Sequence, residues 1–301
     1  MAHVPVLLQS SVDALAIAPG HVVIDGTLGT GGHSAEILKR FGSSITLIAI
    51  DKDAESIARA KTVLAPLGGT VRVINDSFAH IETILRTEHI PAVNGMLLDL
   101  GWNTDQLSEG RGFSFQNDEP LDMNYHAYDG RPEGQFTAAD VVNNWSEESI
   151  ANVLYAYGEE RYARRIAKVI VERRAIAPIM TTHTLVDVIR QAVPAAYRHG
   201  RLHPATRSFQ ALRIVVNDEL GELKKALVAA VAALAPGGRL AVITFHSLED
   251  RIVKQTFRDM AHEDVVSLIT KKPVVASPEE LSINPRARSA KLRTVEKSLV
   301  T

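Results

Sequence analysis

The sequence predicts an α/β fold in which a mostly parallel sheet is interrupted by a long helical segment. Short apolar runs of strand type alternate with helical patterns through the first hundred residues. The alternation stops at about residue 103 and resumes after residue 207. Most of the runs are apolar at every position, which is expected for strands covered by helices on both faces of a sheet.

The first part of the chain supplies four expected strands and the helices that connect them. The strands are HVVID (21–25), TLIAID (46–51), VRVIND (71–76) and GMLLDLG (95–101). The connecting segments include expected helices over 34–40 and 54–64. Strands that alternate with helices in this way form βα units, so we expect these four strands to be parallel.

The middle of the chain has helical periodicity and no convincing strand. In GEERYARRIAKVIVERR, one helical face is apolar and the opposite face is basic: Ala163, Ile166, Ala167 and Ile170 against Arg161, Arg164, Arg165 and Lys168. We therefore expect a helical insertion over 105–207, and a discontinuous sheet domain formed by 1–104 and 208–301. A solvated helix face and a surface for RNA are both open roles for these arginines.

Alternation then resumes to complete the sheet domain. The expected elements are a helix over 215–234, a Pro-Gly-Gly turn at 236–238, a strand at 239–245, a helix at 250–260, and two strands at 265–270 and 290–297.

Composition limits the class of protein. The chain has 46% hydrophobic and 23% charged residues and no cysteine, which excludes disulfides, thiolate zinc sites and cysteine nucleophiles. No apolar run approaches the ~20 residues of a membrane span, and no signal peptide is recognisable, so we expect a cytoplasmic protein without membrane contact. The 11 histidines include no pair with metal-ligand spacing, so no metal is expected. A net charge of −2 means that any nucleic-acid binding must come from local basic patches.

The stretch DGTLGTGGHS (25–34) follows the first expected strand and carries the strongest signal for a ligand. A Walker A loop is excluded because Gly32 is followed by His33 and Ser34. A dinucleotide fingerprint would find two of its three glycines, with Ser34 at the third position. The order Asp, Thr, Gly, Gly, Gly is typical of S-adenosylmethionine-dependent methyltransferases, although an ordinary strand-to-helix turn has the same local composition.

Polar groups at the following strand ends favour the cofactor over the ordinary turn. Asp51 ends the second strand, where a carboxylate can accept from ribose hydroxyls, although it can also cap the next helix. Phe78 follows the third strand and can stack on adenine, and Asp99 ends the fourth. The carboxyl ends of parallel strands meet at one edge of a sheet, so we expect these groups to lie together there.

Blocks along nearly the whole chain strengthen this interpretation. They are HVPVLL, TLGTGGHS, GRGFSF, PLDM, YGEERYARRIA, HPATRSFQALRIVVNDEL, TFHSLEDRIVK and NPRARSAKLR. In this order they resemble the MraW (RsmH) family of bacterial 16S rRNA cytosine-N4 methyltransferases. The resemblance implies a class I, Rossmann-like methyltransferase fold with a helical insertion for RNA recognition. It also implies S-adenosylmethionine as cofactor, and as substrate a decoding-centre cytosine of 16S rRNA in the small ribosomal subunit. Both a monomer and a homodimer remain open.

Carried over by position, the family's cofactor contacts fall on seven residues: Gly31, Gly32, His33, Asp51, Phe78, Asp99 and Gln106. Asp99 and Asn103 are placed by the sequence, at the end of the fourth strand and just after it, to accept the proton of the target amine. Asp99 has the alternative role of only holding the cofactor.

The chain departs from the family pattern after the fourth strand. The family reads DLGVSSPQLD, whereas residues 99–108 read DLGWNTDQLS. Trp102 is therefore a candidate to stack on the target base, or else it fills a packing position. The segment DMNYHAY (122–128) also lacks the arginine that usually follows PLDM in the family.

Candidate RNA contacts lie in two blocks near the end of the chain. NPRARSAKLR offers Arg286, Arg288, Lys291 and Arg293, which are either phosphate ligands or a solvated strand edge. In TFHSLEDR, His246 either shapes the base pocket or caps the next helix.

Three other functions remain open for the chain: a methyltransferase with a different substrate, an RNA-binding ribosome-assembly factor with altered or lost methyl transfer, and, more distantly, a NAD-dependent oxidoreductase.

Overall fold

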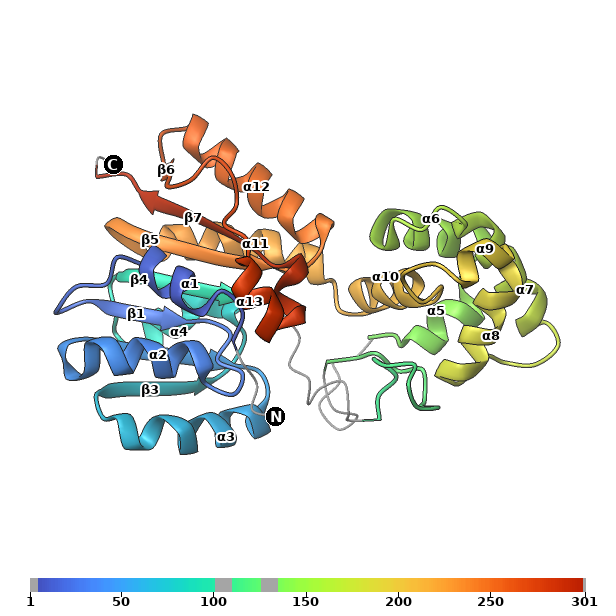
Figure 1. Ribbon diagram of the computed structural model, residues 1–301, viewed down its shortest axis with the longest axis horizontal. Coiled ribbons are helices and arrows are strands. Elements are labelled where there is room, and N and C mark those ends of the chain that lie inside the picture. Colours follow the sequence, from blue (N-terminus) through green and yellow to red (C-terminus); the bar gives the residue numbers. More distant parts are fainter. Residues whose placement is uncertain (1–4, 101–109, 126–134, 300–301) are drawn as a thin grey trace. The chain divides into compact units, whose positions relative to one another are not determined.

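The computed structural model describes residues 5–100, 110–125 and 135–299 and divides the chain into two compact units (Figure 1). The sheet unit comprises Met1–Gly101 and Leu220–Thr301, and the helical unit comprises Trp102–Glu219. The second boundary thus falls at 219 and not at the expected 207. The reason is that helix α10 (Thr206–Val216) packs against α6 (Glu147–Gly158) of the helical unit.

The sheet unit contains one seven-stranded sheet in the order β3-β2-β1-β4-β5-β7-β6. Its strands are β1 (Val22–Asp25), β2 (Thr46–Asp51), β3 (Thr70–Asn75), β4 (Val93–Asp99), β5 (Leu234–Thr244), β6 (Val266–Leu268) and β7 (Lys291–Lys297). Strands β1 to β5 pair in parallel, and β7 runs antiparallel to both β5 and β6. The expected α/β fold with a mostly parallel sheet is therefore confirmed.

Each strand of the sheet centre buries alternate side chains on opposite faces. Val23 belongs to one apolar cluster and its neighbour Ile24 to the other. One cluster includes side chains from α1 (Leu8–Ala14), α2 (Gly32–Phe41) and α3 (Ala54–Leu64). The other includes side chains from α4 (Ile81–Thr87), α11 (Glu219–Ala233) and α12 (Ser247–His262). Both faces are thus covered, as the uninterrupted apolar runs predict.

Two expected elements near the end of the chain were wrong in detail. The helix expected over 215–234 is broken at Asn217, because its side chain donates to the carbonyls of Met123 and Arg213 and Asp218 adopts a positive φ of 45°. The expected Pro-Gly-Gly turn lies inside β5. A Cβ on Gly238 would lie about 3 Å from the Val93 carbonyl oxygen, so glycine allows the close approach to β4. The pairing of β4 with β5 shifts register here, between Val93 and Gly95.

The helical unit is built from six described helices. They are α5 (Ala138–Asn144), α6 (Glu147–Gly158), α7 (Ala163–Arg174), α8 (Thr182–Ala192), α9 (Ala195–Arg198) and α10 (Thr206–Val216). The predicted apolar face of α7 is buried in its core, at Ala163, Ile166, Ala167 and Ile170. No helix in the described ranges of the chain is both long enough and apolar enough to cross a membrane.

Candidate functional site

The glycine-rich loop between β1 and α2 is bonded to the ends of both strands that flank β1. The Gly26 amide donates to the Leu97 carbonyl of β4 at 2.9 Å. The Leu28 amide donates to the Ile50 carbonyl of β2 at 2.9 Å. These bonds hold the loop at the edge of the sheet where the carboxyl ends of β1, β2 and β4 meet, which is where α/β folds bind ligands.

Glycines of this loop serve different purposes. Gly31 caps α2 with a φ of 86°, and a Cβ there would lie 3.2 Å from the Ala60 side chain. A Cβ on Gly32 would collide with the ring of Pro5. Gly29 also has a positive φ, of 50°, but a Cβ there would meet nothing within 4 Å. Helix packing therefore accounts for Gly31 and Gly32, whereas the loop is open beside Gly29.

The buried carboxylate of Asp25 is hydrogen-bonded to the loop and to the first turn of α2. Asp25 accepts a hydrogen bond from the Ser34 hydroxyl at 2.7 Å and another from the Thr27 amide at 3.2 Å. Burial raises the pKa of the Asp25 carboxyl. The sequence pattern contained Asp25 but gave it no role, and its position suits it for shaping the loop.

Asp51, at the end of β2, holds the open part of the loop. Its Oδ2 accepts from the Gly29 amide at 2.7 Å and its Oδ1 from the Asp53 amide at 2.9 Å. Burial raises the pKa of Asp51, against the lowering effect of these two bonds. The alternative of Asp51 as a helix cap is wrong, because Asp53 caps α3. A carboxylate has about four acceptor positions, so Asp51 retains capacity for a ligand.

The end of β3 lies beside the same loop. The Asn75 side chain donates to the carbonyls of Asp51 and Lys52 at 2.9 and 3.0 Å, which ties β3 to the end of β2. Phe78 begins a short 3-10 helix (Phe78–His80) and is half-buried. Its Cβ would lie 3.2 Å from a Cβ on Gly26, so Phe78 adjoins the start of the loop.

Asp99, at the end of β4, is connected to both the loop and α2. Its amide donates to the Thr27 hydroxyl at 2.6 Å. One of its carboxylate oxygens lies 3.7 Å from Nδ1 of the buried His33, whose Nε2 is 3.1 Å from the Val6 carbonyl. The structure thus brings together His33, Asp51, Phe78 and Asp99 around one loop. Thr27 was not among the predicted site residues, and its only signal in the sequence was its place in the loop pattern.

Three predicted site residues, Trp102, Asn103 and Gln106, lie outside the described residues. The segment DMNYHAY (122–128) also departs from the family pattern, and its described residues, 122–125, have packing roles in the helical unit. Met123 is buried, and the Tyr125 hydroxyl donates to Glu219 at 2.6 Å.

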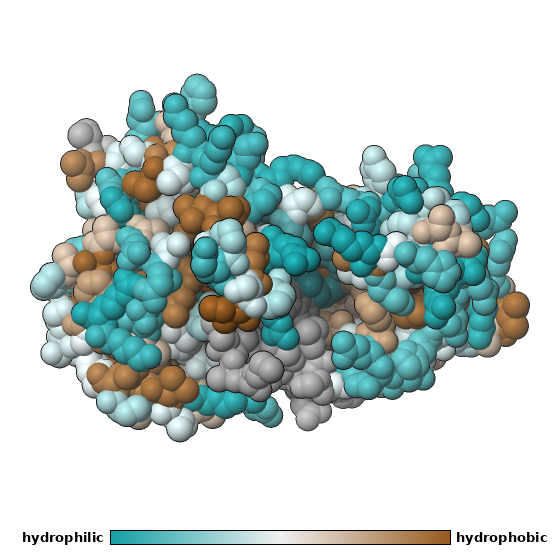
Figure 2. All heavy atoms as spheres, in the orientation of Figure 1, coloured by the Kyte–Doolittle hydropathy of each residue, from teal (hydrophilic) through white to brown (hydrophobic). Residues whose placement is uncertain are grey.

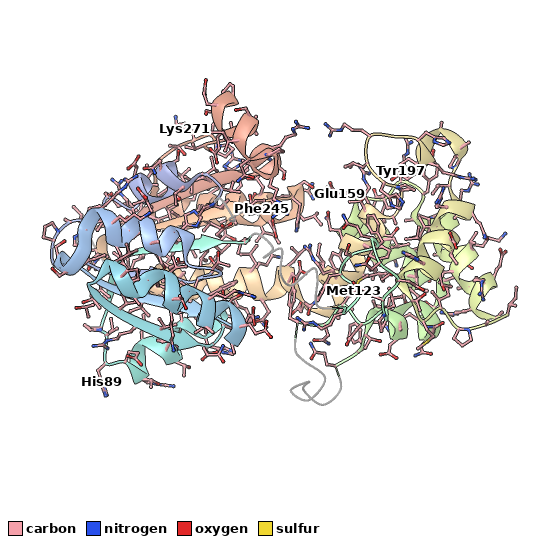
Figure 3. All side chains as sticks on the ribbon, turned by 60° about the horizontal axis from the view of Figure 1, so that its bottom comes forward. His89, Met123, Glu159, Tyr197, Phe245 and Lys271 are labelled. Carbon is pink, nitrogen blue, oxygen red and sulfur yellow. The ribbon has the colours of Figure 1, made fainter. Side chains whose placement is uncertain are left out.

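His246 is the residue that precedes α12. It follows Phe245, which lies just after the end of β5 and is labelled in Figure 3. The His246 ring accepts from the Glu249 amide at 3.4 Å, and Glu249 in return accepts from the amides of Phe245 and His246. His246 therefore caps α12. A contact of His246 with RNA stays a prediction.

Two of the four predicted basic RNA contacts pair with one carboxylate. Asp250 accepts from the Arg293 side chain at 2.7 Å and from Lys291 at 2.9 Å. Burial alone would raise the pKa of Asp250, but these hydrogen bonds outweigh it and hold the pKa below its usual range. Arg286 and Arg288 have exposed side chains. A solvated strand edge therefore does not describe Lys291 and Arg293, which join β7 to α12.

The chain is similar to known proteins along nearly its whole length. The model of the MraW methylase family matches residues 1–298. Ribosomal RNA small subunit methyltransferase H of Heliobacterium modesticaldum is 47% identical over 312 residues, covering 98% of each chain. The protein of the same name from Symbiobacterium thermophilum is also 47% identical, over 98% of this chain and 96% of the relative.

Solved structures show a more distant likeness. An rRNA methylase from Streptococcus thermophilus aligns over 99% of both chains with a TM-score of 0.45 and 12% identity. TrmN from Thermus thermophilus aligns over 97% of this chain and 48% of its own, with a TM-score of 0.47 and 12% identity.

Proposed function

Because the chain belongs to the MraW methylase family, we propose that it methylates the N4 amine of a decoding-centre cytosine in 16S rRNA of the small ribosomal subunit. The observation that carries this proposal is the 47% identity to ribosomal RNA small subunit methyltransferase H over 98% of both chains. The sequence similarity extends over the helical unit as well as the sheet unit, so it is not limited to the part of the chain expected to bind the cofactor. We infer that the protein acts in the cytoplasm, where it would meet small ribosomal subunits.

The strand-end site fits S-adenosylmethionine, the methyl donor of such enzymes. Asp51 has acceptor capacity for the ribose hydroxyls, and each such charged hydrogen bond contributes ~1.5–3 kcal/mol. Gly29 leaves open space where a Cβ would otherwise project, so the backbone can approach the donor closely. Phe78 adjoins the same loop and offers an aromatic face to the adenine. Gly31, Gly32 and His33 would shape the site by fixing the start of α2, and Gln106 is retained as a contact on the resemblance alone.

The reaction chiefly requires orientation. S-adenosylmethionine supplies a methyl group that is already electrophilic because it is bonded to a sulfonium. The N4 amine of cytosine is a weak nucleophile, because its lone pair is delocalised into the ring. Fixing the amine in line with the methyl group can supply up to ~7–11 kcal/mol, and no covalent nucleophile is needed.

Asp99 is the proposed acceptor for the amine proton. Its backbone is fixed by Thr27, and its carboxylate adjoins His33, so the group is held at a defined position beside the loop. A hydrogen bond from the amine to this carboxylate would localise the lone pair on nitrogen and remove the proton after transfer. From the sequence, Asn103 is the second candidate for this role and Trp102 is the candidate for stacking on the cytosine.

The substrate base must leave its stack to reach a methyl group at the sheet edge. We assign RNA recognition to the helical unit, together with Arg286, Arg288 and His246 of the sheet unit. Lys291 and Arg293 share the charge of Asp250, so their contribution would be smaller.

The test is transfer of labelled methyl from S-adenosylmethionine to small ribosomal subunits that lack the modification, with naked rRNA and free cytidine in parallel. Label mapped to the exocyclic nitrogen of one decoding-centre cytosine is the expected result. Label on another position or molecule would replace the proposed substrate. Binding of S-adenosylmethionine and subunits without transfer would identify an assembly factor and refute the proposed activity.

A further inference from the structure

An arginine of the helical unit lies over two tyrosine rings at the start of α7. The rings of Tyr162 and Tyr197 meet edge to face with centroids 5.0 Å apart. The guanidinium carbon of Arg161 lies 4.8 Å from the first centroid and 4.9 Å from the second. Arg165 approaches the Tyr162 ring at 6.0 Å. We call Arg161, Tyr162, Arg165 and Tyr197 the arginine–tyrosine cluster; Tyr197 is labelled in Figure 3.

A buried carboxylate fixes both tyrosines. Glu160 is fully buried, and its two oxygens accept from the Tyr197 hydroxyl at 2.6 Å and the Tyr162 amide at 2.8 Å. Burial and the bond to Glu160 raise the pKa of Tyr197 to about 12, so the hydroxyl stays protonated and keeps donating. The rings are therefore held in place before any ligand arrives. A guanidinium resting on such rings loses less conformational freedom when it binds.

The segment of the helical unit that contains Tyr197 is rich in basic residues, although Arg213 within it is paired with Glu219. From residue 188 to residue 217 the chain contains no Asp or Glu, while it contains five arginines and two histidines: Arg190, Arg198, Arg201, Arg207, Arg213, His199 and His203. Burial, and then the charge of Arg190, lower the pKa of His203. Figure 2 shows hydrophilic side chains over much of the visible surface of the helical unit.

The two arginines of the cluster, Arg161 and Arg165, have no carboxylate paired with them among the described residues. Arg161 and Arg165 are exposed, and neither forms an ion pair with any residue in the described ranges. The neighbouring Glu160 is buried beneath the tyrosines. Glu159 is exposed, and its carbonyl accepts from the Arg207 side chain. The structure thus keeps two exposed cations at an aromatic site, where they are available to a polyanion.

We propose that the arginine–tyrosine cluster binds the phosphate backbone of single-stranded RNA, with Arg161 as the principal contact; this rests on the proposed function. A planar guanidinium donates two parallel hydrogen bonds to a phosphate. Proteins that bind single strands combine such cations with aromatic rings, which accept neighbouring bases. The role of the cluster would be to bind RNA and not to take part in methyl transfer.

The experiment compares the full chain carrying Arg161→Gln with Arg86→Gln, which makes the same substitution at an exposed residue of α4 without an ion pair in the described structure. Binding of a fluorescent single-stranded RNA is measured by anisotropy over a range of KCl concentrations. Arg161→Gln is expected to weaken binding by about 5- to 10-fold and to lower the salt-dependence slope by about 0.7. Arg86→Gln is expected to change neither quantity, and neither variant should change S-adenosylmethionine affinity.

A second variant separates charge from folding. Arg165→Gln should weaken RNA binding less than Arg161→Gln. Loss of the contacts with the tyrosine rings should lower the unfolding temperature of either variant by only a few degrees. RNA binding by Arg161→Gln equal to that of Arg86→Gln overturns the site. The proposed function is judged separately, by methyl transfer with the wild-type chain. RNA binding through Arg161 without transfer would refute the activity and leave the site standing.

Discussion

The imidazole of His33 connects the first turn of α2 to the end of β4, because its Nδ1 lies 3.7 Å from Oδ2 of Asp99. The other ring nitrogen lies 3.1 Å from the Val6 carbonyl. The side chain of His33 is buried, whereas that of Asp99 is 18% exposed. The Asp99 carboxylate therefore lies against His33 and is partly exposed to solvent.

Replacement of Asp99 by Asn tests whether this carboxylate takes part in the reaction. The amide keeps the shape but cannot accept a proton, so we expect kcat to fall by about 10²- to 10⁴-fold. The affinity for S-adenosylmethionine, measured by calorimetry, should change by less than about threefold (~0.6 kcal/mol). An affinity loss as large as the loss of kcat would show instead that Asp99 only holds the cofactor.

Asp51→Asn should weaken S-adenosylmethionine binding by about tenfold or more, because one charged hydrogen bond contributes ~1.5–3 kcal/mol. The amide oxygen can still accept from the Gly29 backbone, but the NH2 group would then face the Asp53 amide, so the unfolding temperature of the variant is measured alongside its cofactor affinity. Asp53→Asn is the matched control, since Asn also caps helices well and Asp53 holds only α3 in the described structure. Equal cofactor affinity in the two variants would exclude Asp51 from the binding site.

Gly29→Ala and Gly20→Ala separate ligand contact from backbone strain. Both glycines have a positive φ, of 50° and 82°, and neither has an atom within 4 Å of a built Cβ. Each variant should therefore lose about 1 kcal/mol of unfolding free energy, as seen in urea titrations. Only Gly29→Ala should also lose affinity for S-adenosylmethionine. An unchanged affinity would mean that the donor does not approach this part of the loop.

Asp250 should make stability depend on pH in the acid range. Hydrogen bonds from Arg293 and Lys291 lower its folded-state pKa, so its contribution is complete above the unfolded pKa of ~3.9 and is lost as pH falls through the folded value. Asp250→Asn should therefore reduce the unfolding free energy by about 2 kcal/mol at pH 7 and progressively less below pH ~4.

Asp259→Asn, at an exposed position of the same helix, serves as the control and should have little effect at either pH. A constant difference between Asp250→Asn and wild type across the whole acid range would contradict an ionic contribution.

The sequence predicted the sheet and the strand-end groups because both depend on local patterns. An apolar run followed by Asp, as at Asp25, Asp51 and Asp99, is visible without tertiary information. The partners of these groups were not predictable. That Thr27 would bind the Asp99 amide follows from how β1 and β4 lie side by side, and nothing near either residue in the sequence indicates it.

Other errors have the same origin. The helical pattern across 215–234 is uninterrupted in sequence, and the break comes from Asn217 binding the carbonyl of Met123, far away along the chain. Lys291 and Arg293 resemble a free basic segment until α12 brings Asp250 beside them.

The placement of β4 beside β5 has a consequence for the order of folding. These strands are neighbours in the sheet, yet the entire helical unit is synthesised between them. The contacts of the helical unit's core are comparatively local, so it can fold on the ribosome while the edge of β4 still lacks its partner. Strand β6 must wait longer, until β7 emerges and inserts between it and β5. Completion of the sheet is therefore expected to be the slow, late step, and a nascent chain stalled before residue 234 would expose an unpaired strand edge.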